Sequence, residues 1–320
     1  MQIESVYLAR SEARERLQEI PTLRRLPDGA ISMGVGVTDQ PGDFTLAVRI
    51  REKFGVVDIE SRLRTALRPI VEDALEIRYT GPAFAIQPLT ASGSTLRAGP
   101  VSIGDSISHA QALGGTLGFF AVDRGDGYPG IVSANHVIAE ADAANIGDSI
   151  VRPATGATGS TKIAELVRYE SLCGGGLKLA DAAFARLTTG NYDPSTLPNG
   201  ALLRVLASSN ESVAVGKAGE KSGLTYGRIT SFDYDKLLVL GYSASLPVVR
   251  FENQIEIEST DPSVGFALPG DSGSLVYNDR FHAVGLLFSR CVAGGTYDNG
   301  LAYASPISAV LDLLQVDLLA

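Results

Sequence analysis

Ser272 lies between two glycines in the stretch GFALPGDSGS, residues 265–274, which is the part of the sequence best suited to nucleophilic chemistry. A serine hydroxyl attacks a carbonyl carbon well only when a base removes its proton and nearby donors stabilise the resulting oxyanion. Gly270 and Gly273 permit backbone conformations that are closed to residues with a Cβ. We therefore expect the main-chain amides of Gly270 and Ser272 to form an oxyanion hole. An ordinary Asp-Ser-Gly turn is the alternative interpretation, and the partners of Ser272 decide between the two.

Three histidines are available as the base. His136 lies in IVSANHVIAE at the end of an apolar, strand-like run, and a strand end can direct a side chain into a cleft. His109 lies in a polar stretch and His282 at the start of an apolar run, so we interpret both as structural. Asp181 is predicted to be the orienting carboxylate, because it interrupts the apolar run LADAAFARL and a charge buried there needs a partner.

The chain order His136, Asp181, Ser272 is that of the chymotrypsin-like serine proteases. SANHV, DAAFARL and LPGDSGSLV resemble the histidine, aspartate and serine motifs of that superfamily, although Ser274 stands where its serine loop has a second glycine. The stretches IVSANHVIAE and GKAGEKSGLTYGRI are also similar to a group of bacterial trypsin-like proteins related to the plant narrow-leaf protein. The three motifs are specific only in combination.

The resemblance implies a mainly β fold with two six-stranded barrels and a cleft between them. His136 and Asp181 would come from the first barrel and Ser272 from the second. In this family His136 would act as general base and then general acid, Asp181 would fix its tautomer, and Ser272 would form the acyl-enzyme. The implied function is a serine endopeptidase that acts on protein or peptide substrates.

The resemblance also places Phe266, six residues before the nucleophile, at the base of the primary specificity pocket. The shape of this pocket would depend further on Phe288, Ser289 and Arg290. An apolar floor disfavours lysine and arginine, because burying their charge without a partner is costly. We therefore expect a preference for small or medium apolar side chains.

Two alternatives remain open at this stage. Lys217 or Lys221 in GKAGEKSG would serve a serine–lysine dyad, although lysines in such a stretch are more often solvated. The second alternative is a non-catalytic or latent scaffold that has kept the protease fold. The presence of all three triad residue types favours the enzyme.

Three regions are expected to position these residues. Residues 1–80 predict a small α+β module, in which an amphipathic helix precedes a ββαβ unit. Residues 81–114 predict a linker, and residues 115–320 are expected to form the protease domain. The domain should end in a helix that begins near Pro306 and packs against the second barrel. The predicted fold class is thus mainly β, a chymotrypsin-like double β-barrel with an N-terminal α+β module and a C-terminal helix.

Composition narrows the partners and the compartment. A net charge of -9 and a pI near 4.9 argue against nucleic acid or membrane as a partner. The two cysteines, Cys173 and Cys291, are expected to be free thiols, and the sequence predicts a cytoplasmic protein. No cofactor and no metal are expected, because the histidines are few and scattered. The N-terminal module is a possible surface for a homo-oligomer.

Overall fold

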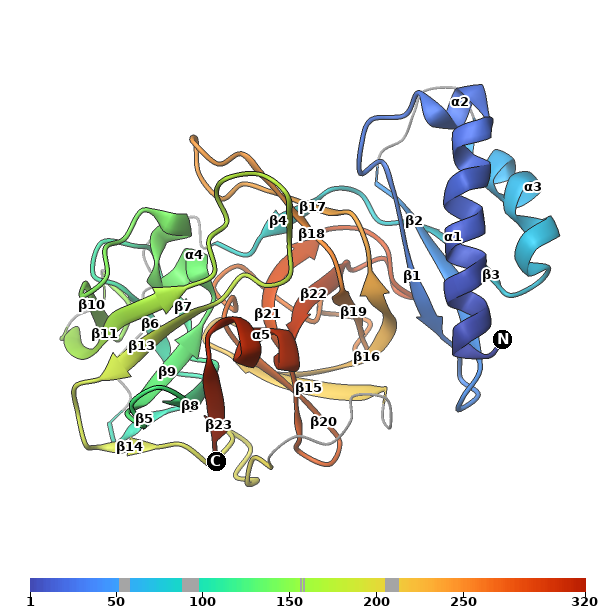
Figure 1. Ribbon diagram of the computed structural model, residues 1–320. Helices are drawn as coiled ribbons and strands as arrows, with labels where there is room; N and C mark the ends of the chain where they lie inside the picture. Colours follow the sequence, from blue (N-terminus) through green and yellow to red (C-terminus); the bar gives the residue numbers. More distant parts are fainter. Residues whose placement is uncertain (52–57, 88–97, 156, 158, 205–212) are drawn as a thin grey trace.

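The computed structural model describes residues 1–51, 58–87, 98–155, 157, 159–204 and 213–320. An α+β module at the N-terminus, blue in Figure 1, lies beside the orange strands of a β-barrel, and a second curled sheet, green, lies on the other side of that barrel. Among the described residues, no helix is long and apolar enough to cross a membrane.

The N-terminal module contains two helices followed by a ββαβ unit, one short helix more than the sequence predicts. Its elements are α1 (Ile3–Glu19), α2 (Pro21–Arg24), β1 (Ile31–Val37), β2 (Phe44–Ile50), α3 (Ile59–Val71) and β3 (Leu75–Tyr79). Strand β2 pairs antiparallel with β1 and parallel with β3. The Asp58 side chain caps the N-terminus of α3 by accepting a hydrogen bond from Ser61 N–H at 2.9 Å. Helix α1 buries Ala13 and Leu17 in the core of its own module.

The first sheet beyond the N-terminal module is curled, in the order β23-β8-β9-β13-β11-β10-β6-β7, where β23 is Val316–Leu319. Its elements and those beside it are β5 (Val101–Ser102), β6 (Ser106–His109), β7 (Gly115–Thr116), β8 (Phe119–Asp123), β9 (Pro129–Ser133), α4 (Asn135–Ile138), the 3-10 helix η1 (Glu140–Asp142), β10 (Ser149–Arg152), β11 (Thr161–Tyr169), β13 (Ala183–Leu187) and β14 (Tyr192–Asp193). Strand β6 falls within the stretch predicted as a linker, but it pairs with β10 and β7 of this sheet.

The second sheet closes on itself. Each of six described strands pairs with the next around a ring: β15 (Ala214–Gly219), β16 (Gly223–Tyr234), β19 (Gln254–Ser259), β22 (Leu301–Pro306), β21 (Ala283–Cys291) and β20 (Leu275–Asn278). Further strands extend it beyond β21, namely β4 (Ala83–Ala85), β17 (Leu237–Leu240), β18 (Val248–Phe251) and β12 (Leu177–Lys178). One closed barrel and one curled half-barrel confirm the predicted mainly β, chymotrypsin-like fold.

The C-terminal helix is shorter than the sequence predicts. Helix α5 (Ile307–Leu313) packs against β21 and β22 of the closed barrel, as expected. The chain then forms strand β23 (Val316–Leu319), which pairs with β8 of the other sheet. Leu314 is buried at the end of the helix and Val316 is buried in the strand, so the apolar spacing after Leu313 fits an extended segment as well as a helix.

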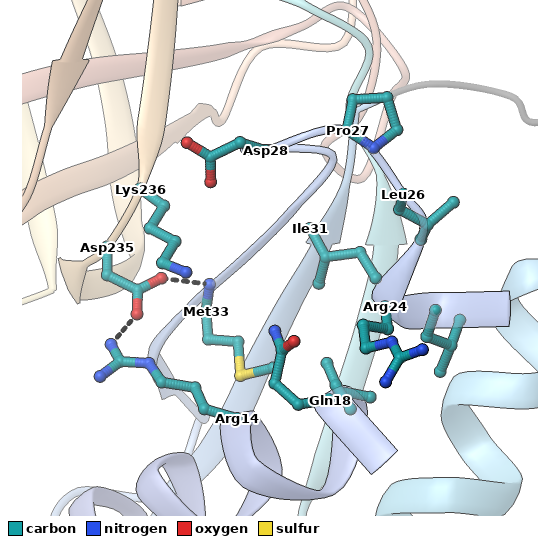
Figure 2. A pocket seen from close by; sticks show the side chains of 13 residues that line it. Arg14, Gln18, Arg24, Leu26, Pro27, Asp28, Ile31, Met33, Asp235 and Lys236 are labelled. Carbon is teal, nitrogen blue, oxygen red and sulfur yellow. Dashed lines mark hydrogen bonds and ion pairs between the residues drawn. The ribbon is translucent and has the colours of Figure 1, made fainter. Parts of the chain in front are cut away.

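The N-terminal module is joined to the closed barrel by strand pairing and by buried charge. Strand β1 pairs with β16. The guanidinium of Arg49, on β2, is fully buried and lies 2.7 Å from a carboxylate oxygen of Glu256, on β19. At the same junction Asp235 is paired with Arg14 of α1 and accepts from Met33 N–H at 2.8 Å, beside a pocket lined by both units (Figure 2). Removing Arg49 would leave the buried Glu256 carboxylate without this partner, whereas Arg49 would keep a second carboxylate, that of Glu76, at 2.8 Å.

Candidate active site

Two paired strands of the half-barrel bring His136 and Asp181 together. His136 follows β9 in helix α4, Asp181 precedes β13, and β9 and β13 are antiparallel neighbours. Asp181 Oδ2 lies 2.6 Å from His136 Nδ1, and Oδ1 accepts from His136 N–H at 3.3 Å. Both residues are buried, and His136 Nε2 has no hydrogen-bond partner among the described residues. An imidazole held in this way has its outer nitrogen available to accept a proton.

Tyr242 covers the histidine from the side of the closed barrel. Its ring lies edge-on to the imidazole, with 5.6 Å between the ring centroids. Burial, together with the nearby carboxylate of Asp181, raises the pKa of Tyr242 well above its ordinary value, so the phenol stays neutral. His136 and Tyr242 line a pocket with Gln87 and with Gln111, Ala112, Leu113, Gly114 and Glu140 of the half-barrel.

The loop that carries Ser272 requires glycine at two positions. Gly270 and Gly273 have φ values of +110° and +87°. A Cβ on Gly273 would lie 2.1 Å from Ser133 Oγ and 2.4 Å from Thr116 O. The carbonyl of Ser272 accepts a hydrogen bond from Thr116 N–H at 2.8 Å, so the loop is docked on the half-barrel. Ser274, in place of the second glycine, donates its hydroxyl to Asp271 O at 2.6 Å and bridges the turn.

The hydroxyl of Ser272 faces a main-chain carbonyl of the same protein. Ser272 Oγ donates to Ile86 O at 3.1 Å, and Gly270 N–H donates to the same oxygen at 3.3 Å. Of the two amides predicted for the oxyanion hole, that of Gly270 therefore contacts this carbonyl. The Ser272 amide makes no hydrogen bond to it within the described part of the chain.

Asp271, the neighbour of Ser272, is anchored by a buried ion pair that the sequence reasoning missed. Its carboxylate lies 2.9 Å from Lys217 Nζ, and both side chains are fully buried. The same carboxylate accepts from the amides of Leu268, Lys221 and Ser222 at 2.8 to 3.0 Å. Burial by itself would raise the pKa of Asp271, but the Lys217 ammonium and these donors hold it below its ordinary value.

The expectation that Lys217 is solvated is therefore wrong, whereas Lys221 is exposed. The ammonium of Lys217 contacts Asp271 and the Ser222 hydroxyl, and no hydrogen bond joins it to Ser272 in the described structure. The only sequence signal is its place in AVGKAG, where small and apolar residues surround a single charge. These contacts give no support to the serine–lysine dyad.

The four residues assigned to the specificity pocket have different surroundings. Phe266 is buried in an apolar cluster that also contains Ala267 and Ile86. The ring of Phe288 belongs to another cluster and lies 4.7 Å from the Phe251 ring, while its carbonyl accepts from Ile86 N–H at 3.2 Å. The remaining two make hydrogen bonds to main-chain carbonyls, Ser289 Oγ to Phe84 O and Arg290 Nη1 to Ala267 O.

The other two histidines and the cysteines lie elsewhere. His109 is buried on β6, with its ring nitrogens 2.7 Å from Glu140 and 3.2 Å from Asp148. His282 precedes β21 and approaches neither Asp181 nor Ser272 through any described hydrogen bond. Cys173 is exposed and Cys291 is buried, and both are free thiols as predicted. No group of three or more potential metal ligands occurs among the residues that the structure describes.

Comparison with known proteins assigns the family. A family model described as a trypsin-like peptidase domain matches residues 116–286, more than half of the 320 residues. The chain belongs to this family. The matched segment contains His136, Asp181 and Ser272, so all three candidate residues of this trypsin-like peptidase lie inside it. No curated protein sequence matches the chain.

Several solved structures are similar to this trypsin-like peptidase. A Nocardiopsis protease is 19% identical and covers 71% of this chain and 100% of its own, with a TM-score of 0.47. Protease A of Thermobifida fusca is 15% identical, with coverages of 69% and 100% and a TM-score of 0.47. A chymotrypsin of Cellulomonas bogoriensis is 16% identical, with coverages of 68% and 98% and a TM-score of 0.45.

Proposed function

We propose that this trypsin-like peptidase is a serine endopeptidase that uses His136, Asp181 and Ser272 as its triad. One arrangement carries the proposal: a buried imidazole is fixed by a carboxylate at 2.6 Å and keeps Nε2 unbonded among the described residues, while Ser272 Oγ and the Gly270 amide share one carbonyl oxygen. In this proposal Ser272, His136, Asp181 and the Gly270 amide act as nucleophile, base, orienting acid and oxyanion donor of one site.

The chemistry follows from these positions. The Ser272 hydroxyl hydrogen, which rotates freely about the Cβ–Oγ bond, turns from the substrate carbonyl to His136 Nε2 as Oγ attacks the carbonyl carbon. Asp181 stabilises the imidazolium that forms, and the Gly270 amide stabilises the oxyanion. His136 then protonates the leaving amine, and a water molecule hydrolyses the acyl-enzyme by the same steps in reverse order.

The finer parts of the hypothesis are also proposals. The Phe266 cluster is apolar, which supports a preference for aliphatic over basic side chains at the residue preceding the cleaved bond. Within the family, we retain the likeness to the bacterial proteins related to the narrow-leaf protein. A latent state has a specific observation in its favour, since Ser272 Oγ donates to Ile86 O rather than to His136.

Two substitutions test the proposal. Ser272→Ala removes one oxygen from a buried loop and should leave the fold intact, but it should lower peptide hydrolysis about a millionfold because the acyl-enzyme cannot form. His136→Ala should be nearly as damaging, and the double variant little worse than either single one, because the two residues act as a unit. Hydrolysis by Ser272→Ala at the wild-type rate would refute the mechanism.

A further inference from the structure

A segment of the chain itself lies in the candidate active site. Strand β4 enters from the N-terminal module and pairs antiparallel with β21, with Ala85 opposite Ser289 and Phe84 opposite Arg290. Ile86 N–H continues this pairing by donating to Phe288 O at 3.2 Å. Strand addition of this kind is a general way of binding an extended peptide, because the main-chain hydrogen bonds do not depend on sequence. Strand β4 is not a member of the closed six-strand ring.

The Ile86 side chain lies where the specificity pocket is predicted. It is 1% exposed and belongs to the apolar cluster that contains Phe266 and Ala267. Phe84, two residues earlier, is 38% exposed and the small Ala83 is fully buried, so the large apolar side chain that this segment buries is that of Ile86. A medium aliphatic side chain at this position agrees with the preference expected from an apolar pocket.

The carbonyl of Ile86 meets both reacting parts of the site. Its oxygen accepts from the Gly270 amide at 3.3 Å and from Ser272 Oγ at 3.1 Å. On the far side of this carbonyl, the Gln87 side chain donates to Tyr242 O at 3.0 Å and lines the pocket that contains His136. The backbone turns at Ile86, because Gln87 N–H donates to Ala85 O at 2.9 Å. Backbone pairing as far as Ile86, burial of its side chain and the position of its carbonyl are those of a bound peptide substrate with Ile86 before the susceptible bond and Gln87 after it.

We propose that the chain is its own substrate and that Ser272 cleaves the Ile86–Gln87 peptide bond within the same molecule. This inference rests on the proposed serine peptidase function. Ser272 Oγ forms a bond to the Ile86 carbonyl carbon and its proton passes to His136; the bond to Gln87 N breaks, and that nitrogen takes the proton as the new N-terminus. Water then releases Ile86 as a carboxylate and restores Ser272.

The paired strand β4 also restricts access to the site. While β4 is paired with β21, a second peptide has no free strand edge there to bind. After the cut, residues 1–86 remain held by β1–β16 pairing and by the buried Arg49–Glu256 ion pair. The two fragments should therefore separate in denaturant but stay together under native conditions.

The first test follows the mass of the purified full-length protein with time. We expect fragments 1–86 and 87–320, formed at a rate independent of protein concentration, while Ser272→Ala stays intact. Tagged Ser272→Ala protein mixed with an excess of wild-type protein should also stay intact, because the reaction is intramolecular. Cleavage of that tagged protein, or cleavage of wild type at another bond in place of Ile86–Gln87, would overturn the proposal.

The second test uses matched isoleucine variants. Ile86→Asp puts an unpaired carboxylate in the apolar pocket and should slow self-cleavage by at least about 100-fold. Ile146→Asp makes the same change at a side chain that is 61% exposed in the half-barrel, and it should be cut at the wild-type rate. Ile86→Ala, which keeps the pocket apolar, should be slowed less, and it replaces Ile86→Asp if that variant does not fold. Equal rates for Ile86→Asp and Ile146→Asp would refute the role of Ile86.

A fluorophosphonate probe separates this inference from the function on which it rests. Ile86→Asp should free the site, so its Ser272 should react faster with the probe than that of uncut wild type. If Ser272 of Ile86→Asp reacts but wild type never cleaves itself, self-cleavage is wrong and the peptidase stands. If folded wild type, Ile86→Asp and Ile86→Ala all fail to react, the proposed function fails and the inference with it.

Discussion

The Lys217–Asp271 ion pair should support the serine loop, and Lys217→Met tests this. Both side chains are fully buried, with 2.9 Å between Lys217 Nζ and Asp271 Oδ2. Breaking a buried pair from one side commonly costs about 3–5 kcal/mol in the free energy of unfolding. Three amides would still hold the Asp271 carboxylate, so we expect a loss near the lower end, about 3 kcal/mol. The Gly270 amide lies in the same loop, so probe labelling of Ser272 should slow as well.

Denaturant unfolding and probe kinetics would measure these effects. Lys221→Met removes an exposed lysine four residues away, and its unfolding free energy should stay within about 0.5 kcal/mol of wild type. The pKa of Asp271 is lower in the folded protein than its ordinary value. The ion pair therefore stabilises the fold fully at pH values above the ordinary pKa of an aspartate, and this stabilisation is lost as the pH falls through the lowered pKa. The stability difference between wild type and Lys217→Met should therefore shrink in strong acid. Equal stability of Lys217→Met and Lys221→Met at neutral pH would refute this reasoning.

Three further predictions follow from the structure. Gly273→Ala should nearly abolish hydrolysis, because the added Cβ would overlap Ser133 and Thr116. Gly147→Ala is the control, because Gly147 has a similar φ of +95° and open space around it. Equal activity of the two variants would contradict the argument. A peptide-library profile should show cleavage after aliphatic residues, and a profile dominated by lysine or arginine would show the pocket assignment to be wrong. A chain that starts at Gly81 should unfold at a lower temperature than the full chain, because Glu256 loses its ion-pair partner Arg49. If the mass of this shorter chain in solution showed the same oligomeric state as the full chain, the idea that the N-terminal module supports assembly would be dropped.

The sequence predicted the architecture where local pattern and tertiary structure agree. The N-terminal helix, the hairpin of β1 and β2, helix α3 and strand β3 follow from apolar spacing and turn residues. The barrel strands follow in the same way, and the resemblance supplied the double-barrel arrangement. The C-terminal end differed, because the apolar residues after Leu313 fit a strand as well as a helix, and only β8 as a pairing partner decides between them.

Contacts between distant segments were beyond sequence reasoning. Lys217 was expected in solvent, because nothing near it in the chain shows that Asp271, 54 residues later, would be its partner. The approach of Ile86 to Ser272, across 186 residues, was hidden in the same way within a stretch predicted as a linker. Both depend on strand pairing that brings remote residues together, and a single sequence gives no direct signal of such pairing.

The most direct test of the central claim is to locate the adduct of a fluorophosphonate probe by peptide mass mapping. We expect one adduct on Ser272 in the self-processed wild-type protein, and none in folded His136→Ala, because the hydroxyl then keeps its proton. An adduct on a different residue, or a folded and processed chain that gains no adduct, would contradict the assignment of Ser272 as the nucleophile.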